Sequence, residues 1–298
     1  MSSLLTTFVG RSMRAAVIAA GNEANARHHY RGVVTENGAF ENVEINVGAG
    51  VPGFTMELWS VLSETFAVEI ISPTGERLPR LSRQEIRKDY RFVFENTEVS
   101  IDKIFSFSAN ELQGVFLRFT GPSQGIWNIR VYAEEVFTGE FDMWLPLGAL
   151  LDGEVFFLRS NPDSTITVPG DARFPITVGG YDSRNRSIDI ESGRGYTIEG
   201  AVKPDFVAPA VDVLGAARGN RFVTRTGTSA AAAISTGAVA LLLEWAVVRG
   251  NFSRITSANI KGILIRGADR DPGRLYPNRE WGYGSLNLYE AFAVLRTV

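Results

Sequence analysis

The sequence predicts an α/β protein whose parallel-sheet core is interrupted by an inserted all-β antiparallel domain. Residues 15–20 form a small apolar run without alternation, which is typical of a strand buried on both faces of a parallel sheet. Between about 31 and 160 the chain changes to aromatic segments that alternate in hydrophobicity, the pattern of antiparallel strands. Residues 228–248 then form the most apolar long run, which favours a buried helix.

The elements follow in chain order. A short helical stretch comes before the strand at 15–20, which ends at Gly21-Asn22. In the middle of the chain, turn sequences at 72–75 (Ser-Pro-Thr-Gly) and 120–123 (Thr-Gly-Pro-Ser) separate the strands. The clearest of these strands cover residues 43–47, 66–71, 90–94, 115–119 and 127–132. They indicate a sandwich or jelly roll of roughly eight or nine strands.

After the inserted domain the mixed pattern returns, and residues 176–180 predict another strand. Helices are expected at 228–248, 257–267 and 288–295. The core is therefore expected to be discontinuous, with residues 1–30 and 161–298 forming it and residues 31–160 forming the jelly-roll domain.

Charge and composition exclude several classes of protein. Thirty basic and 33 acidic residues leave a formal net charge of −3, which favours neither a nucleic-acid partner nor a polybasic membrane surface. With no cysteine, disulfides, thiolate metal sites and a cysteine nucleophile are excluded, and no cofactor or metal is expected. No membrane span is expected either, because Glu244 interrupts the longest candidate at 237–248. The first ten residues lack the features of a secretory signal, and the localisation stays open.

Three short segments can carry chemistry. Gly227-Thr228-Ser229 places a hydroxyl at the start of the predicted helix, where unpaired N–H groups favour developing negative charge. The alternative is that Thr228 or Ser229 only caps the helix. Gly21-Asn22 ends a buried strand with a carboxamide that can donate a hydrogen bond to an oxyanion, although this pair is also common in turns. Residues 203–211 (Lys-Pro-Asp-Phe-Val-Ala-Pro-Ala-Val) form a rigid segment of a kind that is generally structural.

Together the three segments resemble the subtilisin-like serine peptidases, the subtilases. The family's serine motif, Gly-Thr-Ser-x-Ala-Ala-Pro followed by a glycine, corresponds to residues 227–233 with Gly237 in register, and only Ala233 departs from it. The resemblance implies that Ser229 is the nucleophile and that Asn22, with the backbone N–H of Ser229, forms the oxyanion hole. It also implies that the substrate is contacted by Ala20, Gly21, Glu23 and Thr228.

The insertion narrows the resemblance to clostridial subtilases of the spore-germination type, which carry a jelly-roll domain after the oxyanion asparagine. Residues 125–131 and 139–145 are similar to the closing hairpin of that domain. Residues 276–278 (Tyr-Pro-Asn) and 281–284 (Trp-Gly-Tyr-Gly) are similar to the end of the family's catalytic domain. The resemblance thus covers nearly the whole chain, and it implies a secreted or spore-associated bacterial protein.

The family carries two further triad motifs upstream of the oxyanion asparagine, one with Asp and one with His. Neither motif has a counterpart in this sequence. The two histidines, His28 and His29, follow Asn22, and a structural or surface role is expected for them in preference to catalysis. The chain therefore resembles the C-terminal part of a subtilase. The implied partners are a peptide or protein substrate and the upstream part of the same enzyme.

Other charged residues are expected to be structural. Asp269 and Asp271 can be read as calcium ligands, but the neighbouring arginines at 266, 270 and 274 favour charge-paired loops. Arg91 and Arg118 are expected on the solvated face of strands. The sequence as a whole predicts a serine endopeptidase of subtilase type that is incomplete in this chain. The alternative is a catalytically inactive relative or fragment whose jelly-roll domain serves as a binding or structural module.

Overall fold

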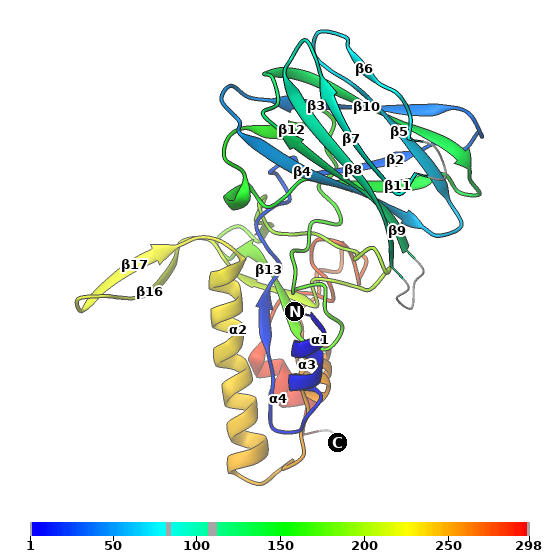
Figure 1. The fold of residues 1–298 in the computed structure, drawn as a ribbon. Coiled ribbons are helices and arrows are strands. Elements are labelled where there is room, and N and C mark those ends of the chain that lie inside the picture. Colours follow the sequence, from blue (N-terminus) through cyan, green and yellow to red (C-terminus); the bar gives the residue numbers. More distant parts are fainter. Residues whose placement is uncertain (1, 82–84, 107–111, 297–298) are drawn as a thin grey trace. The chain divides into compact units, whose positions relative to one another are not determined.

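The computed structural model describes residues 2–81, 85–106 and 112–296. The chain forms two compact units (Figure 1): unit 1 comprises Met1–Asn25 and Pro162–Val298, and unit 2 comprises Ala26–Asn161. Unit 2 is thus longer at both ends than the expected 31–160. The reason at its start is that β2 (His29–Val33) pairs with β11 (Glu140–Trp144) inside unit 2.

Unit 1 is built on a small, mainly parallel sheet. Its strand β13 (Ile176–Asp182) pairs in parallel with β1 (Val17–Ala19) and with β15 (Phe206–Pro209). The short strand β14 (Ser187–Ile188) pairs with β13 in the antiparallel direction. Most residues of β13 and β15 are buried, as apolar runs without alternation predict for a sheet that is covered on both faces.

Helices and a hairpin complete unit 1. They are α1 (Ser2–Val9), β16 (Val213–Ala217), β17 (Arg221–Arg225), α2 (Thr228–Leu243), α3 (Ser257–Arg266) and α4 (Leu288–Val294). The side chain of Thr256 caps α3 and that of Asn287 caps α4, so both helices begin where a hydrogen-bonding residue satisfies the first free N–H groups. The three helices expected after residue 228 are confirmed.

Helix α2 packs one face on the sheet and leaves the other face open. Its buried residues are Thr228, Ala231, Ser235, Ala238, Val239 and Leu242. On the exposed face, beside the exposed Thr236, a stripe is formed by Ala233, Gly237, Ala240 and Leu241, and Leu241 is 50% exposed. A Cβ built on Gly237 meets no heavy atom within 4 Å. The expectation of a helix buried all round is therefore wrong for the described structure, because the sheet covers only one side of it.

The same helix bears on the expectation that no segment spans a membrane. With the π-helical turn Glu244–Val248 (η2) that continues it, Thr228–Val248 is 21 residues long and apolar enough to meet the criteria for a membrane span. Its buried face contacts β1, β13 and β15, which is the arrangement of a core helix.

Unit 2 consists of two antiparallel sheets that share one hydrophobic core. The first sheet has the order β12 (Val155–Phe157), β3 (Phe40–Val47), β10 (Gly125–Glu135), β5 (Thr65–Ile71) and β6 (Arg77–Leu78). The second has the order β2, β11, β4 (Gly53–Val61), β9 (Leu112–Thr120), β8 (Thr97–Ser106) and β7 (Arg87–Phe92). A single 3-10 turn, Gly148–Leu150, is described between β11 and β12. With five and six strands, the described sheets exceed the expected eight or nine.

Aromatic rings fill the core of unit 2. Trp127 is fully buried in β10, and its ring meets those of Phe92 and Phe119 edge-on, with centroids 5.1 Å and 5.4 Å apart. Its indole N–H donates to the carbonyl oxygen of Ser123 at 3.0 Å, so the one polar atom of the ring is satisfied. The alternation of aromatic residues along the sequence therefore marks the inward face of these strands.

A buried carboxylate fixes the turn between β10 and β11. Glu64 accepts hydrogen bonds from the backbone N–H groups of Phe137, Thr138 and Gly139 at 3.0, 2.9 and 3.1 Å. Burial alone would raise the pKa of Glu64, but these N–H donors and the Thr138 hydroxyl outweigh it and lower the pKa. Glu64 is thus charged in the folded protein near neutral pH.

Candidate active site

The start of α2 carries the hydroxyl group that the sequence pattern indicates. Gly227 precedes the helix with a φ of 128°, a conformation that favours glycine, and Thr228 and Ser229 are the first two helical residues. The N-cap position is Gly227, which has no side chain to cap the helix, so the alternative that Thr228 or Ser229 is only an N-cap is wrong. Ser229 is exposed and lies in the first turn, where free backbone N–H groups concentrate positive charge.

Asn22 lies against this helix start. Its Oδ1 accepts hydrogen bonds from the backbone N–H and from the hydroxyl of Thr228, each at 3.0 Å. A Cβ added to Gly227 would come within 3.1 Å of Asn22 Nδ2, so a glycine lets the carboxamide approach this closely. Because the oxygen of the carboxamide faces Thr228, the N–H donors of the exposed Asn22 side chain are kept for another acceptor.

The Thr228 hydroxyl joins the two chain segments. It accepts a hydrogen bond from the N–H of Gly21 at 3.2 Å, and its own proton is within reach of Asn22 Oδ1 and of the Gly21 carbonyl oxygen. The expectation that Thr228 contacts a substrate stays a prediction. Thr228 is fully buried, and its side chain orients Asn22. The sequence gives no local signal for this role, because the partner of the hydroxyl is distant in the chain.

The residues before Asn22 are packed closely. Ala20 donates its N–H to the carbonyl oxygen of Val178 and accepts from the N–H of Thr167, both at 2.9 Å. Ala20 is fully buried, and the expectation that it contacts a substrate stays a prediction. Gly21 has a φ of 100°, and a Cβ there would lie 2.5 Å from Thr167 Cγ2. Of this segment, Gly21 and Glu23 are partly exposed.

The Lys-Pro-Asp motif holds two strands of the sheet together. Lys203 Nζ is buried and donates to Asp205 Oδ2 at 2.9 Å and to Thr177 Oγ1 at 2.8 Å. Asp205 also accepts from the N–H of Thr177 at 2.7 Å and pairs with Lys261 at 3.2 Å. Burial lowers the pKa of Lys203 to about 8, although Asp205 opposes this shift. The network joins β13 to the start of β15, so it supports the sheet on which the site is built.

The Trp-Gly-Tyr-Gly segment packs on the same motif. Gly282 has a φ of 53°, and a Cβ there would lie 2.1 Å from the carbonyl oxygen of Pro204, so the two backbones are in contact. Tyr283 donates its N–H to the carbonyl oxygen of Asp205 at 3.0 Å. Trp281 is buried, and its ring centroid lies 5.6 Å from that of Tyr181. Two motifs that are distant in sequence thus form one packed region.

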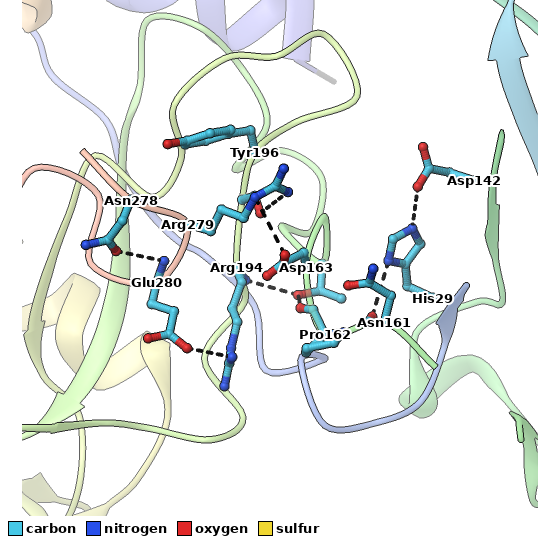
Figure 2. A network of polar contacts seen from close by, with 12 residues as sticks. His29, Asp142, Asn161, Pro162, Asp163, Arg194, Tyr196, Asn278, Arg279 and Glu280 are labelled. Carbon is cyan, nitrogen blue, oxygen red and sulfur yellow. Dashed lines mark hydrogen bonds and ion pairs between the residues drawn. The ribbon is translucent and has the colours of Figure 1, made fainter. Parts of the chain in front are cut away.

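Ion pairs tie three further loops of unit 1 together, as Figure 2 shows. Arg194 pairs with Glu280 at 2.6 Å, and Arg279 pairs with Asp163 at 3.6 Å. Arg279 also lies over the ring of Tyr196, 5.0 Å from its centroid. These contacts were not predicted from the sequence, because each joins residues from different loops.

The two histidines belong to unit 2. His29 is buried in β2. Its ring stacks on that of Trp144. His29 Nε2 lies 2.9 Å from Asp142 Oδ1, and its Nδ1 lies 3.2 Å from the Asn161 carbonyl oxygen (Figure 2). Both ring nitrogens are therefore engaged. His28 is partly exposed beside Gly148. Since the sequence holds only these two histidines, unit 1 contains none.

The charged residues considered for other roles have local partners. Asp271 pairs with Arg274 at 3.7 Å, and Asp269 accepts from the side chain of Asn287 at 2.8 Å. Within the described ranges, no group of three or more His, Asp or Glu residues is arranged to hold a metal ion. Arg91 and Arg118 are exposed on unit 2, as expected.

Comparison with known proteins finds a family match and similar serine proteases. Residues 152–284 match the Subtilase family, Peptidase_S8. The serine protease AprX of Bacillus subtilis is 30% identical over 157 residues, which cover 46% of this chain and 32% of AprX. The C5a peptidase of Streptococcus pyogenes serotype M1 is 29% identical over 253 residues, which cover 78% of this chain and 21% of the peptidase.

A solved structure matches both units. The CspB protease of Clostridium perfringens has a TM-score of 0.91 and 30% sequence identity, over 99% of this chain and 63% of that chain. The present chain thus spans about a third of AprX and less than two thirds of the CspB structure. It shares with CspB the parallel-sheet core with helices and the inserted antiparallel β domain. The chain therefore belongs to the subtilase family of serine peptidases.

Proposed function

We propose that this chain supplies the nucleophile and the oxyanion-binding half of a subtilase-type serine endopeptidase. The observation that supports it most is the contact between Asn22 and Thr228, which brings a carboxamide to the residue before Ser229. The reaction is peptide-bond hydrolysis through an acyl-enzyme. A base takes the proton of Ser229 Oγ, the oxygen attacks the scissile carbonyl, and water later releases the acyl group.

Asn22 and the helix start stabilise the charge that forms on the carbonyl oxygen. Thr228 engages the acceptor oxygen of the Asn22 carboxamide, so the N–H donors of Nδ2 are preorganised for the oxyanion. The backbone N–H of Ser229 is the second donor, and the positive end of the α2 dipole adds to the field. Gly21 and Glu23, which are partly exposed beside Asn22, contact the substrate residue before the cleaved bond.

The base and its carboxylate come from a second polypeptide segment, the upstream part of the same subtilase. Unit 1 has no histidine, and His29 uses both ring nitrogens inside unit 2. Two exposed surfaces of unit 1 support this part of the proposal. The exposed stripe of α2 is apolar, Gly237 on it has open space in place of a neighbour, and β1 lies at the edge of the described sheet. A helix packed on the stripe and a strand added to β1 would bury these surfaces.

The sharpest test is labelling with a fluorophosphonate, which modifies activated serines. The chain alone is expected to stay unlabelled, because a serine hydroxyl without a positioned imidazole is a weak nucleophile near pH 7. Co-expression with the gene region upstream of Met1 is expected to give stoichiometric labelling at Ser229, and Ser229→Ala removes it. Labelling of the chain alone that is lost in His28→Ala or His29→Ala would contradict the proposal.

The alternative function is that of an inactive relative whose unit 2 is a binding or structural module. Two observations favour it: both ring nitrogens of His29 are engaged, and unit 1 contains no histidine. The same experiment separates the two functions. If the upstream region carries an Asp motif and a Gly-His-Gly-Thr motif and labelling appears on co-expression, the chain is part of an active peptidase. If the complex forms and Ser229 stays unlabelled, the inactive relative is the correct function.

A further inference from the structure

The hairpin of β16 and β17 has no neighbouring strand. The two strands pair only with each other, so both outer edges present free backbone groups within the described part of the chain. Figure 1 shows the hairpin projecting sideways from the N-terminal end of α2. An isolated two-stranded sheet is only marginally stable in water, because too little of its surface is covered. A third strand would satisfy one edge and bury part of a face.

One face of the hairpin is apolar and open to solvent. The register pairs Leu214 with Thr224 and Ala216 with Phe222, which puts these four side chains on the same face. Leu214 is 67% exposed and Phe222 is 71% exposed. Large apolar side chains at this exposure on a projecting element are typical of a contact surface.

The opposite face and the turn carry arginines. Arg221 and Arg225 lie on the face opposite to Phe222, with Val223 between them, and Arg218 lies in the turn. All three are exposed, and none has an ion-pair partner among the described residues. The acid at the base of the hairpin, Asp212, is already paired with Arg184 at 2.9 Å. The hairpin therefore carries three positive charges that an acidic partner would neutralise.

The base of the hairpin is tied to the candidate active site. Asp212 donates its N–H to Thr226 Oγ1 at 3.1 Å, and Gly227 donates its N–H to the carbonyl oxygen of Ala210 at 2.9 Å. β17 runs through Thr226 and Gly227 directly into the first turn of α2. A polypeptide on β17 would therefore lie on a surface continuous with the segment that carries Ser229.

We propose that β17 is the docking strand for an extended acidic polypeptide in which acidic and apolar residues alternate. The partner adds as a third strand, so that its backbone pairs with the free edge of β17. The alternation of acidic and apolar residues follows from the pleat of the strand, because successive side chains of a strand point to opposite faces of the sheet. Partner residues on one face meet Phe222 and must be apolar, and their neighbours on the other face meet Arg221 and Arg225 and must be acidic. Docking does not require Ser229, so it is independent of the proposed catalysis.

The test uses the full chain with Ser229→Ala, which separates binding from cleavage. The probe is a labelled peptide of four Glu-Val repeats, followed by fluorescence anisotropy, and four Lys-Val repeats are the control peptide. We expect the Glu-Val peptide to bind and the Lys-Val peptide to bind at least tenfold more weakly. We also expect binding to weaken as salt is raised, because exposed charges are screened. Equal binding of the two peptides, or none of either, would overturn the proposal.

Variants locate the site. Phe222→Ser and Arg221→Glu with Arg225→Glu are each expected to weaken binding at least tenfold, since they remove the apolar and the charged contact. Arg254→Glu changes an exposed arginine of unit 1 outside the hairpin and is expected to have less than a twofold effect. A Glu-Val peptide with N-methylated backbone amides is expected not to bind. Strand addition would be contradicted if the N-methylated peptide bound as well as the unmodified one. Addition of a polypeptide would also be contradicted if an oligothymidine bound more tightly than the Glu-Val peptide and if the arginine variants lost affinity for the oligothymidine to the same extent.

Discussion

Asn22 and Thr228 are separated by 206 residues in the sequence and joined by two hydrogen bonds of 3.0 Å. Both bonds end on the same acceptor, Asn22 Oδ1, so the carboxamide has one orientation relative to the start of α2. Such a fixed donor needs no reorganisation when negative charge develops, which is the condition for strong electrostatic stabilisation.

The first prediction concerns Asn22 itself. In the complex with the upstream segment, Asn22→Ala is expected to lower kcat by about 10²–10³ with little change in KM, the size measured for one oxyanion donor in subtilisin, a member of the same family. Peptide hydrolysis under steady-state conditions measures it. Asn25→Ala, an exposed asparagine three positions away, is the control and should behave as the wild type. An effect of Asn22→Ala confined to KM would refute the oxyanion role.

Thr228 is predicted to be a positioning residue. Thr228→Val removes the hydrogen bonds of the hydroxyl at similar volume and keeps the backbone N–H bond to Asn22 Oδ1. It is expected to lower kcat about tenfold, because Asn22 loses one of the two hydrogen bonds that orient it. Thr228→Ser retains the hydroxyl and should restore most of the rate. If Thr228→Ser is as slow as Thr228→Val, the hydroxyl does not orient the carboxamide. A thermal unfolding curve for each variant shows whether stability changed in parallel.

A substitution on the exposed stripe of α2 is predicted to block association with the upstream segment without destabilising the chain. Gly237→Leu is expected to leave the chain alone as stable as before or up to about 1 kcal/mol more stable, because leucine favours a helix more than glycine does. The same variant is expected to block association with the upstream segment, measured by co-purification. Gly262→Leu is the matched control, since Gly262 lies within α3 and its Cβ would also meet nothing within 4 Å. Normal assembly of the Gly237→Leu variant would rule out the stripe as the seat.

The lowered pKa of Glu64 predicts that unit 2 loses stability at low pH. Its pKa is lowered in the folded chain, so its contribution to stability is present above the unfolded value near 4.5 and is lost as the pH falls through the folded pKa. Glu64→Gln is expected to cost about 1–3 kcal/mol at pH 7, where three backbone N–H groups lose a charged acceptor, and less at low pH. Urea unfolding at several pH values measures this. Glu98→Gln, at an exposed position, should change neither stability nor its pH dependence.

The lowered pKa of Lys203 predicts that the stability of the chain changes at high pH. Because its folded pKa is lowered to about 8 from 10.5, the unfolded chain holds a proton in this window that the native chain has released. Stability is therefore expected to rise with pH from about 8 to 10.5, with a contribution of up to about 1.4 kcal/mol per pH unit from this group. The ¹³Cε signal of Lys203 measures the titration directly. A midpoint near 10.5 would show that burial does not destabilise the charged form.

Alternation in the sequence predicted most strands of unit 2, but the strand expected at 90–94 shows its limit. The strand ends at Phe92, because the backbone N–H groups of Val93 and Phe94 both donate to the carboxylate of Glu76 at 3.0 Å. Two apolar residues thus lie in a turn and are exposed. A carboxylate distant in the chain decided this, and no local pattern reports it.

By itself, the sequence determined the residues with the chemistry of the site: a hydroxyl after Gly227, a carboxamide after Gly21, and the apolar helix that follows Ser229. Those properties depend on residue type and near neighbours. Only the tertiary structure decided that Thr228 is buried and orients Asn22, and that α2 is covered on one face. Both depend on which distant segments share the same space, because hydrogen bonding and burial are set by neighbours in three dimensions and not by neighbours in the chain.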